Sequence, residues 1–320
     1  MKRIYIVVPC YNESDVLPET TKRLCQKLEG LKQKEKITGD SKVIYVDDGS
    51  GDDTWSQIQA ISRKNPHFEG VKLSRNCGHQ NALLAGLSYA VDKADAVVSM
   101  DADLQDDINA IDQMIDAYEK GSEVVYGVRS KRKKDSFFKR FTAQGFYKLL
   151  KSMGVEIVFN HADYRLLSNR AVKELLSFKE VNLFLRGIVP MIGFKSAKVY
   201  YERNERFAGK SKYPLKKMLA FAFEGITSLS VKPIRLISAL GLICFLISII
   251  MLIVFVAQYF IGITVSGWAS LITSVWALGG LQLLGIGIIG EYIGKIYLET
   301  KQRPRFIIEQ TTDTETEGAD

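Results

Sequence analysis

Acidic side chains follow three short apolar segments of the chain, each where a strand is expected to end. They are Glu13, the pair Asp47 and Asp48, and the spaced pair Asp101 and Asp103. Ligands of open α/β sheets bind beyond the carboxyl ends of the parallel strands. An Asp-x-Asp pair at such a place suits Mg²⁺ or Mn²⁺, since these hard cations take one or two carboxylates and complete their shell with phosphate oxygens and water. The sequence therefore predicts cation-assisted chemistry on a diphosphate.

Short runs rich in β-branched residues precede these acids and predict interior parallel strands. Segments with apolar residues at helical spacing lie between the runs, and Ser50 with Asp53 has the form of a capping box, which predicts a helix beginning just after Ser50. Strand and helix alternation indicates an α/β fold with a Rossmann-like, mostly parallel sheet. The expected strands are 4–8, 43–46, 71–73, 96–100 and 124–128.

Cysteine and histidine chemistry is not expected. The four cysteines form no C-x-x-C pair and sit in apolar stretches, which predicts reduced core thiols. The three histidines have no ligand spacing and are interpreted as ordinary polar residues, although His79 and His161 could touch a ligand. The residues concerned are Cys10, Cys25, Cys77, Cys244, His67, His79 and His161.

The segment from Leu236 to Gly290 contains no Asp, Glu, Lys or Arg. It divides at 262–267 into spans of about 236–261 and 268–289, each long enough for a hydrocarbon core of roughly 30 Å. Basic residues flank the entry and exit whereas the connecting turn has no charge, so the positive-inside rule predicts a multi-pass protein of the cell membrane, the inner membrane where there are two, with both termini and the large domain in the cytoplasm.

The part of the chain before the spans is basic. Residues 1–235 hold 39 of the 43 Lys and Arg and 29 of the 36 Asp and Glu, a net charge of +10. This charge indicates contact with anionic headgroups and phosphorylated ligands. Nucleic acid is not an expected partner, because the sequence has no zinc-finger spacing, helical basic region or aromatic RNA-binding motif.

The sequence also supports structural expectations for two further segments and for the tail. A basic run, Lys131–Lys134, precedes several aromatic residues up to about 150, and this pattern fits either a helix at the membrane surface or a solvated loop leading into an ordinary amphipathic helix. Residues 213–229 are a second candidate interfacial helix. The tail after Glu309 is rich in Thr, Asp and Glu and is expected to be disordered.

Several motifs together resemble family 2 glycosyltransferases with the GT-A fold, and the likeness runs from about residue 4 to residue 305. Others, followed by two spans, resemble the polyprenyl-phosphate glycosyltransferases, a group that includes the bactoprenol glucosyltransferases and dolichol-phosphate mannose synthase. The first set is Val8-Pro-Cys-Tyr-Asn-Glu13, Val46-Asp-Asp-Gly-Ser50, Leu73-Ser-Arg-Asn-Cys-Gly78 with Ala82-Leu-Leu-Ala-Gly86, and Met100-Asp-Ala-Asp-Leu-Gln105. The second is Asp163-Tyr-Arg-Leu-Leu-Ser168, Phe184-Leu-Arg-Gly187 and the stretch from Arg203 to Tyr213.

The resemblance implies four segments. A cytosolic GT-A domain would take in 1–212, an interfacial amphipathic helix 213–232, two transmembrane helices 233–295, and a cytosolic tail 296–320.

The resemblance also implies roles for individual residues. Donor-binding residues would cradle the nucleoside, bond its base and clamp its phosphates; others would hold the cation or the acceptor phosphate. The donor set is Pro9, Tyr11, Glu13, Asp47, Asp48, Asp101 and Arg129; the cation set is Asp101, Asp103 and Gln105; the acceptor set is Arg165, Ser211 and Lys212; and the catalytic set is Asp103, Asp163 and Arg206.

The role of Asp163 stays open. The resemblance makes it the candidate base, but a phosphate monoester with a second pKa near ~6 is largely an oxyanion at neutral pH and hardly needs one. Orienting that phosphate, or holding nearby arginines such as Arg165, fits the chemistry equally well.

The expected function is inverting transfer of glucose or N-acetylglucosamine from a UDP-sugar to polyprenyl phosphate at the cytosolic membrane face, for glycans of the cell envelope. The partners implied are a nucleotide-sugar donor, the lipid, the membrane, further copies of the chain and a flippase. The alternatives are a GDP-mannose-dependent synthase and a silent scaffold or flippase subunit. A processive synthase is disfavoured, because no Gln-x-x-Arg-Trp motif occurs.

Overall fold

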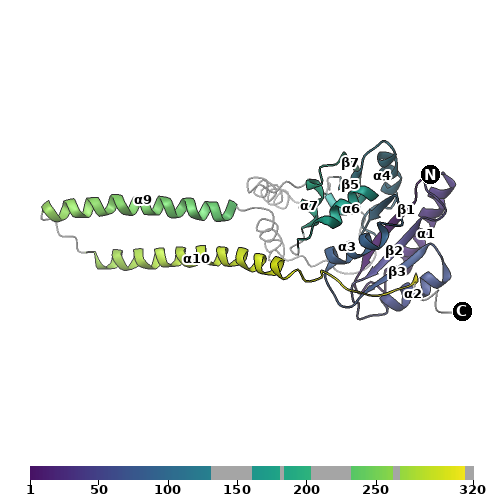
Figure 1. Cartoon of the computed structure of the whole chain (residues 1–320), viewed down its shortest axis with the longest axis horizontal. Helices are drawn as coiled ribbons and strands as arrows, with labels where there is room; N and C mark the ends of the chain where they lie inside the picture. The colour runs from purple at the N-terminus through teal and green to yellow at the C-terminus, as the bar shows by residue number, and fades with distance from the viewer. Residues whose placement is uncertain (131–160, 181–183, 203–231, 262–266, 314–320) are drawn as a thin grey trace. The chain divides into compact units, whose positions relative to one another are not determined.

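The computed structural model describes residues 1–130, 161–180, 184–202, 232–261 and 267–313. These residues fall into two compact units, one that holds the strands with helices α1 to α4, α6 and α7 and one that holds the long helices α9 and α10 (Figure 1). Most of the sequence motifs described above therefore lie in the first unit, whereas the expected helix at 213–229 and four other features lie outside the described residues: Lys131–Lys134, Arg206, Ser211 and Lys212.

The first unit is built on one mixed sheet with the strand order β7-β5-β6-β4-β1-β2-β3-β8. β1 pairs in parallel with β2 and β4, and β2 pairs in parallel with β3. β6 and β8 run antiparallel to their neighbours. The strands are Ile4–Cys10 (β1), Lys42–Asp47 (β2), Phe68–Leu73 (β3), Ala96–Ser99 (β4), Val124–Arg129 (β5), His161–Ser168 (β6), Ser196–Tyr201 (β7) and Ile308–Thr311 (β8).

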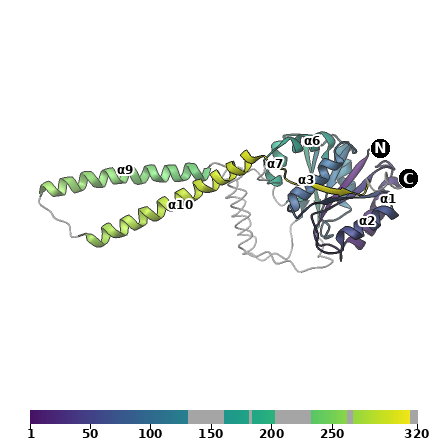
Figure 2. The same ribbon diagram turned by 60° about the horizontal axis from the view of Figure 1, so that its bottom comes forward.

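Helices cover both faces of this sheet, as Figures 1 and 2 show. Alternate residues of β1 point to opposite faces, so Ile6 joins a core with α1, α2 and α4, whereas Val7 joins a second core with α3, α6 and α7. The helices are Leu17–Gln33 (α1), Thr54–Lys64 (α2), His79–Ala90 (α3), Ala110–Glu119 (α4), Asn169–Ser177 (α6), Leu185–Met191 (α7), Lys232–Ile261 (α9) and Trp268–Lys301 (α10).

The five strands expected from apolar runs are confirmed as β1 to β5. The expected helix start was wrong by three residues, because α2 begins at Thr54 and its cap has no side-chain hydrogen bond. The hydroxyl of Ser50 instead accepts the backbone N–H of Asn12, 3.0 Å away. Ser50 therefore joins two loops rather than capping a helix.

The tail also differs from expectation. The chain after Glu309 was expected to be disordered, yet Gln310 and Thr311 complete strand β8, Ile308–Thr311, which pairs with the edge of β3. Composition misled here, because a short edge strand needs few apolar residues when its backbone groups are paired by a neighbour. Residues 314–320 lie outside the described part of the chain.

The second unit consists of α9, with 30 residues, and α10, with 34. One stretch of the described residues, Leu278–Lys301, is long and apolar enough to cross a membrane. α9 ends at Ile261 and α10 begins at Trp268. That both helices cross a membrane stays a prediction.

Candidate functional site

Loops that follow β1 and β2 are joined by backbone-to-side-chain hydrogen bonds. The Asn12 side chain accepts the backbone N–H of Gly51 at 2.9 Å, and Thr54 Oγ1 accepts the N–H of Glu13 at 3.0 Å. Asn12 takes a left-handed backbone with φ 53° to make this turn. The turn leaves the Tyr11 ring 48% exposed at the carboxyl edge of the sheet, so that it is available to stack on a ligand.

The adjacent carboxylates Asp47 and Asp48 are both buried but have different partners. Asp48 accepts the N–H groups of Cys77 and Gly78, at 2.7 and 2.9 Å, so both of its oxygens hold the loop after β3. Asp47 accepts the N–H of Ser50 through one oxygen at 3.3 Å, and its Oδ2 has no partner among the described residues. Burial raises the pKa of both carboxyls.

The loop after β3 packs so closely on Gly49 that no side chain fits there. A Cβ at Gly49 would lie 2.6 Å from the carbonyl carbon of Arg75, and the residue has φ +68°. This loop leads into α3. The first residue of α3 is His79, whose Nε2 lies 3.5 Å from Oδ1 of Asp101. Two of the expected acidic clusters are thus linked through the segment 74–79.

Asp101 lies after β4 in a region of excess negative charge. Burial raises the pKa of Asp101 to about 6; His79 opposes this rise, and the carboxylates Asp106, Asp163 and Asp103 add to it. A divalent cation would relieve that repulsion, and Asp101, Asp103 and the largely buried Gln105 carry the oxygen ligands that Mg²⁺ or Mn²⁺ prefers. No group of three or more His, Cys, Asp or Glu with metal-site geometry occurs within the described ranges.

Asp163 is held between two arginines. It lies on β6, where Oδ1 pairs with Arg165 and Oδ2 lies 3.2 Å from the guanidinium of Arg186 on α7. Burial alone would raise its pKa, but Arg186 and Arg165 outweigh that effect and hold the pKa well below the ordinary range. The carboxylate is therefore charged and weakly basic.

The two arginines differ in accessibility. The Arg165 side chain is 2% exposed and that of Arg186 is 33% exposed. Nε and Nη1 of Arg165 have no hydrogen-bond partner within the described part of the chain, and burial lowers its pKa. Arg186 is thus the accessible cation at this point, and Arg165 is a core residue.

Arg129 ends β5 and lies against Asp106. Its guanidinium donates to Asp106 Oδ1 at 3.1 Å, and the Tyr201 hydroxyl donates to the same oxygen at 2.6 Å. Burial opposes the charge of Arg129, but the Asp106 carboxylate outweighs burial and raises its pKa. Arg129 remains 28% exposed, so it keeps an accessible face beside the loop that carries Asp101 and Asp103.

Three residues of this site were missed or undervalued by sequence reasoning. His79 was interpreted as an ordinary polar histidine that could touch a ligand, Arg186 had no role, and Asp106 was not considered. The signal was present for the first two, since His79 directly follows Gly78 and Arg186 lies within Phe184-Leu-Arg-Gly187. Asp106 carried no such signal, because its contacts with Arg129 and Tyr201 span 23 and 95 residues.

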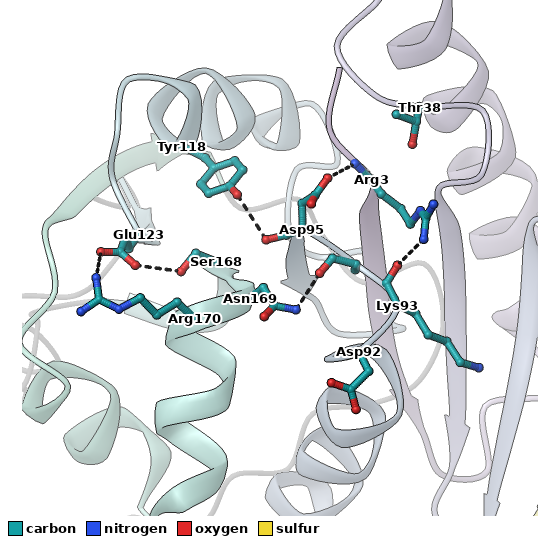
Figure 3. Close-up of a pocket in the computed structure, with 11 residues that line it drawn as sticks. Arg3, Thr38, Asp92, Lys93, Asp95, Tyr118, Glu123, Ser168, Asn169 and Arg170 are labelled. Atoms are coloured by element: carbon teal, nitrogen blue, oxygen red, sulfur yellow. Dashed lines mark hydrogen bonds and ion pairs between the residues drawn. The ribbon is translucent and has the colours of Figure 1, made fainter.

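A separate hollow lies at the opposite, amino-terminal edge of β1 and β4 (Figure 3). It has a volume of about 730 Å³. Several of its polar groups pair with one another. Arg170 forms an ion pair with Glu123 at 3.3 Å, and the Tyr118 hydroxyl donates to the Asp95 carbonyl at 3.2 Å. The carboxylates and arginines described above lie at the other edge.

Comparison with known proteins agrees with this arrangement. Residues 5–176 match the model of glycosyl transferase family 2. The chain is 55% identical to an uncharacterized glycosyltransferase, YkoT, of Bacillus subtilis over 95% of this chain and 90% of that protein. It is 40% identical to the bactoprenol glucosyl transferase of Shigella phage SfX over 96% of this chain and 98% of that protein.

A solved structure is also similar, at 17% identity and a TM-score of 0.46 over 71% of this chain and 77% of the other. It is glucosyl-3-phosphoglycerate synthase from Mycobacterium tuberculosis in complex with Mn²⁺, UDP and phosphoglyceric acid. The family match covers more than half of the chain, and its residues 5–176 include the carboxylates that follow β1, β2 and β4. With its GT-A-like sheet and acidic carboxyl edge, the chain belongs to glycosyl transferase family 2 and is a glycosyltransferase.

Proposed function

We propose that this glycosyltransferase moves a hexose, glucose or N-acetylglucosamine, from a UDP-sugar to polyprenyl phosphate at the cytosolic face of the cell membrane. The near full-length similarity to a protein named bactoprenol glucosyl transferase supports a polyprenyl-phosphate acceptor. The long apolar helix α10 supports a location at a membrane, where such a lipid is found. We further propose that α9 and α10 span the membrane as a pair.

The main observation in support of the proposal is that Asp101 and Asp163, both at the carboxyl edge of the sheet, have opposite electrostatic surroundings. Burial and neighbouring carboxylates raise the pKa of Asp101, whereas Asp163 is held as an anion by Arg186 and Arg165. One part of the site thus favours a cation and the other presents an accessible guanidinium, Arg186. A transfer between two phosphorylated ligands needs both features.

On the donor side, we propose that Tyr11 stacks on the uracil ring and that Asp47 accepts a hydrogen bond from it through Oδ2, which has no partner among the described residues. Pro9 and Glu13 would shape the nucleoside pocket on the same turn. Asp48 would act indirectly, because its two oxygens already hold Cys77 and Gly78.

Asp101, Asp103 and Gln105 would hold a divalent cation, which supplies electrostatic stabilisation of the departing diphosphate. Arg129 would contribute its accessible guanidinium to the same diphosphate, kept in orientation by Asp106. Arg206, Ser211 and Lys212, outside the described residues, would add further phosphate contacts.

On the acceptor side, we propose that Asp163 orients Arg186 rather than removing a proton. Its lowered pKa makes it a poor base, and the acceptor phosphate is already largely ionised near neutral pH. Arg186 would bind the phosphate, and Arg165 would fix Asp163 from the core, since it is too buried to reach the ligand itself. One displacement at the sugar carbon would then invert its configuration.

Membranes that contain the full chain test this function. They would be incubated with Mn²⁺, undecaprenyl phosphate and, separately, UDP-glucose, UDP-N-acetylglucosamine or GDP-mannose, with the lipid products identified by mass spectrometry. We expect one UDP-sugar to give a polyprenyl-phosphate hexose. Turnover of GDP-mannose alone would replace the donor assignment, and no product from any donor would contradict the proposal.

A further inference from the structure

The chain returns to the sheet after its long helices. Residues 305–313, called the strap below, follow the end of α10 at Lys301 and contain β8, which pairs with β3 as the last strand of the sheet (Figure 1). The strap and β3 are separated by more than 230 residues of sequence, yet Thr311 pairs with Val71 and Ile308 with Leu73. The edge of the sheet beside β3 is thus formed by a strand that is far away in sequence.

Side chains fasten the far end of the strap. Thr312 is 7% exposed; its Oγ1 accepts the N–H of Gly70 at 2.9 Å and lies 3.0 Å from the hydroxyl of Ser62, while its own N–H donates to the Gly70 carbonyl. Asp313 accepts the Tyr89 hydroxyl and lies 2.9 Å from Lys93. These polar groups place the end of the strap at one fixed position.

The near end of the strap touches the segment that organises the site. The carbonyl of Ile307 accepts the N–H of Ser74 at 3.0 Å, and the guanidinium of Arg305 donates to the carbonyl of Phe178. Ser74 is the first residue of the loop that packs on Gly49. The same loop donates to Asp48 through the N–H groups of Cys77 and Gly78, and it ends at His79, which lies beside Asp101. A continuous set of contacts thus joins the strap to the acidic edge.

We propose that Ile307, Thr312 and Asp313 are positioning residues for the nucleotide site: the strap holds β3 and residues 74–78 in the conformation that binds the nucleoside diphosphate. This inference rests on the proposed function, because it assigns the strap to the donor side of that site. Affinity for the nucleotide then depends on the part of the chain that returns from the long helices. By linkage, a bound nucleotide must stabilise the strap by the same factor.

Hydrogen exchange of the full chain in nanodiscs measures this coupling in both directions. With UDP and Mn²⁺ as the probe, we expect slower exchange not only at residues 74–78 but also at Thr311 and Thr312. The double variant Thr312→Val with Asp313→Asn should exchange faster at residues 74–78 without any ligand. It should also bind UDP about threefold to tenfold more weakly, in keeping with the loss of one or two buried hydrogen bonds.

Matched variants separate this effect from general destabilisation. Thr38→Val makes the same change in a hydroxyl that bonds Asp40, far from β3 in sequence, and Glu317→Gln makes the same change of charge in the tail. Neither should alter UDP affinity. A double variant that binds UDP as tightly as the parent, or a nucleotide that leaves exchange at Thr311 and Thr312 unchanged, would overturn the positioning role.

A disulfide tests the position of the strap itself. In Ser62→Cys with Thr312→Cys, oxidation should give a cross-link within one chain, because the two hydroxyl oxygens are 3.0 Å apart. A cross-linked dimer on a non-reducing gel, or no cross-link, would contradict the strap as placed. If UDP does not bind at all, the proposed function fails, while exchange in the ligand-free variants and the cross-link still decide whether the strap orders residues 74–78.

Discussion

Asp163 and Asp101 lie at the same edge of the sheet, yet their pKa values are shifted in opposite directions. The direction follows from the neighbours: two arginines beside Asp163 lower its pKa, whereas burial and three carboxylates raise that of Asp101. Groups whose surroundings separate their pKa values are typical of catalytic sites. The identity of the residues could be predicted from sequence, but their opposite electrostatic environments could not.

Replacing Asp103 with Asn should abolish transfer, with a loss of at least about 100-fold in kcat, because it removes charge from the proposed cation site and nothing from the core. Addition of EDTA should have the same effect. Transfer would be measured with labelled donor, and folding by circular dichroism. The control is Asp116→Asn, which changes a surface carboxylate on α4 that pairs with Lys36; full activity of the Asp103 variant or in EDTA would refute the cation assignment.

Replacing Arg186 with Gln should reduce use of the lipid acceptor about tenfold to 100-fold while sparing affinity for UDP. The change removes the accessible guanidinium that pairs with Asp163. Arg186→Lys should keep only part of the activity, because an ammonium group lacks the planar arrangement of N–H donors of a guanidinium. The KM for polyprenyl phosphate and the dissociation constant for UDP would be compared. Arg170→Gln, which removes a guanidinium that pairs with Glu123 at the opposite edge, is the matched control; equal losses in both variants would contradict the role of Arg186.

At the level of elements, the sequence predicted β1 to β5 because interior parallel strands are continuously apolar. β6 was missed, since it contains Asp163 and Arg165, whose charges are tolerated because the two side chains pair with each other and Asp163 also pairs with Arg186 on α7. β7 alternates exposed and buried residues, and β8 is short and polar. These strands form where an existing edge pairs their backbones, which is information that a local pattern does not contain.

The packing of α3 on the sheet gives a stability prediction. A Cβ at Gly86 would lie 2.4 Å from Val7 and 2.7 Å from Val46, so Gly86→Ala should destabilise the protein by about 1–3 kcal/mol despite the better helix propensity of Ala. In contrast, Gly30 on α1 has nothing within 4 Å of the same position, and Gly30→Ala should be neutral or stabilising. Thermal unfolding would compare the two; equal midpoints would show that α3 does not pack this closely.

At the level of the whole molecule, the proposed function requires the enzyme to bring a polar site to a lipid-bound acceptor. A polyprenyl phosphate cannot leave the bilayer without exposing many methylenes at about 0.8 kcal/mol each. The proposed spanning helices would keep the site near the lipid, and the net charge of +10 on residues 1–235 would attract anionic headgroups. Oligomeric state and a flippase partner remain predictions from the sequence.

The basic run Lys131–Lys134 offers a direct test of this attraction, although it lies outside the described residues. Each charge near an anionic surface contributes about 1 kcal/mol. Replacing all four residues with Gln should therefore weaken use of the long-chain acceptor in anionic vesicles while leaving UDP affinity unchanged, and the loss should shrink in neutral vesicles. Acceptor kinetics in nanodiscs with and without anionic lipid would measure both effects.

The control must remove the same charge elsewhere on the molecule. Four exposed lysines of the first unit serve this purpose: Lys2, Lys64, Lys120 and Lys179. If their replacement with Gln weakens acceptor use as much as the loss of Lys131–Lys134, then net charge rather than a local membrane contact attracts the enzyme. If neither set changes the kinetics in either vesicle, the basic run is a solvated loop, and the spanning helices alone bring the site to its lipid.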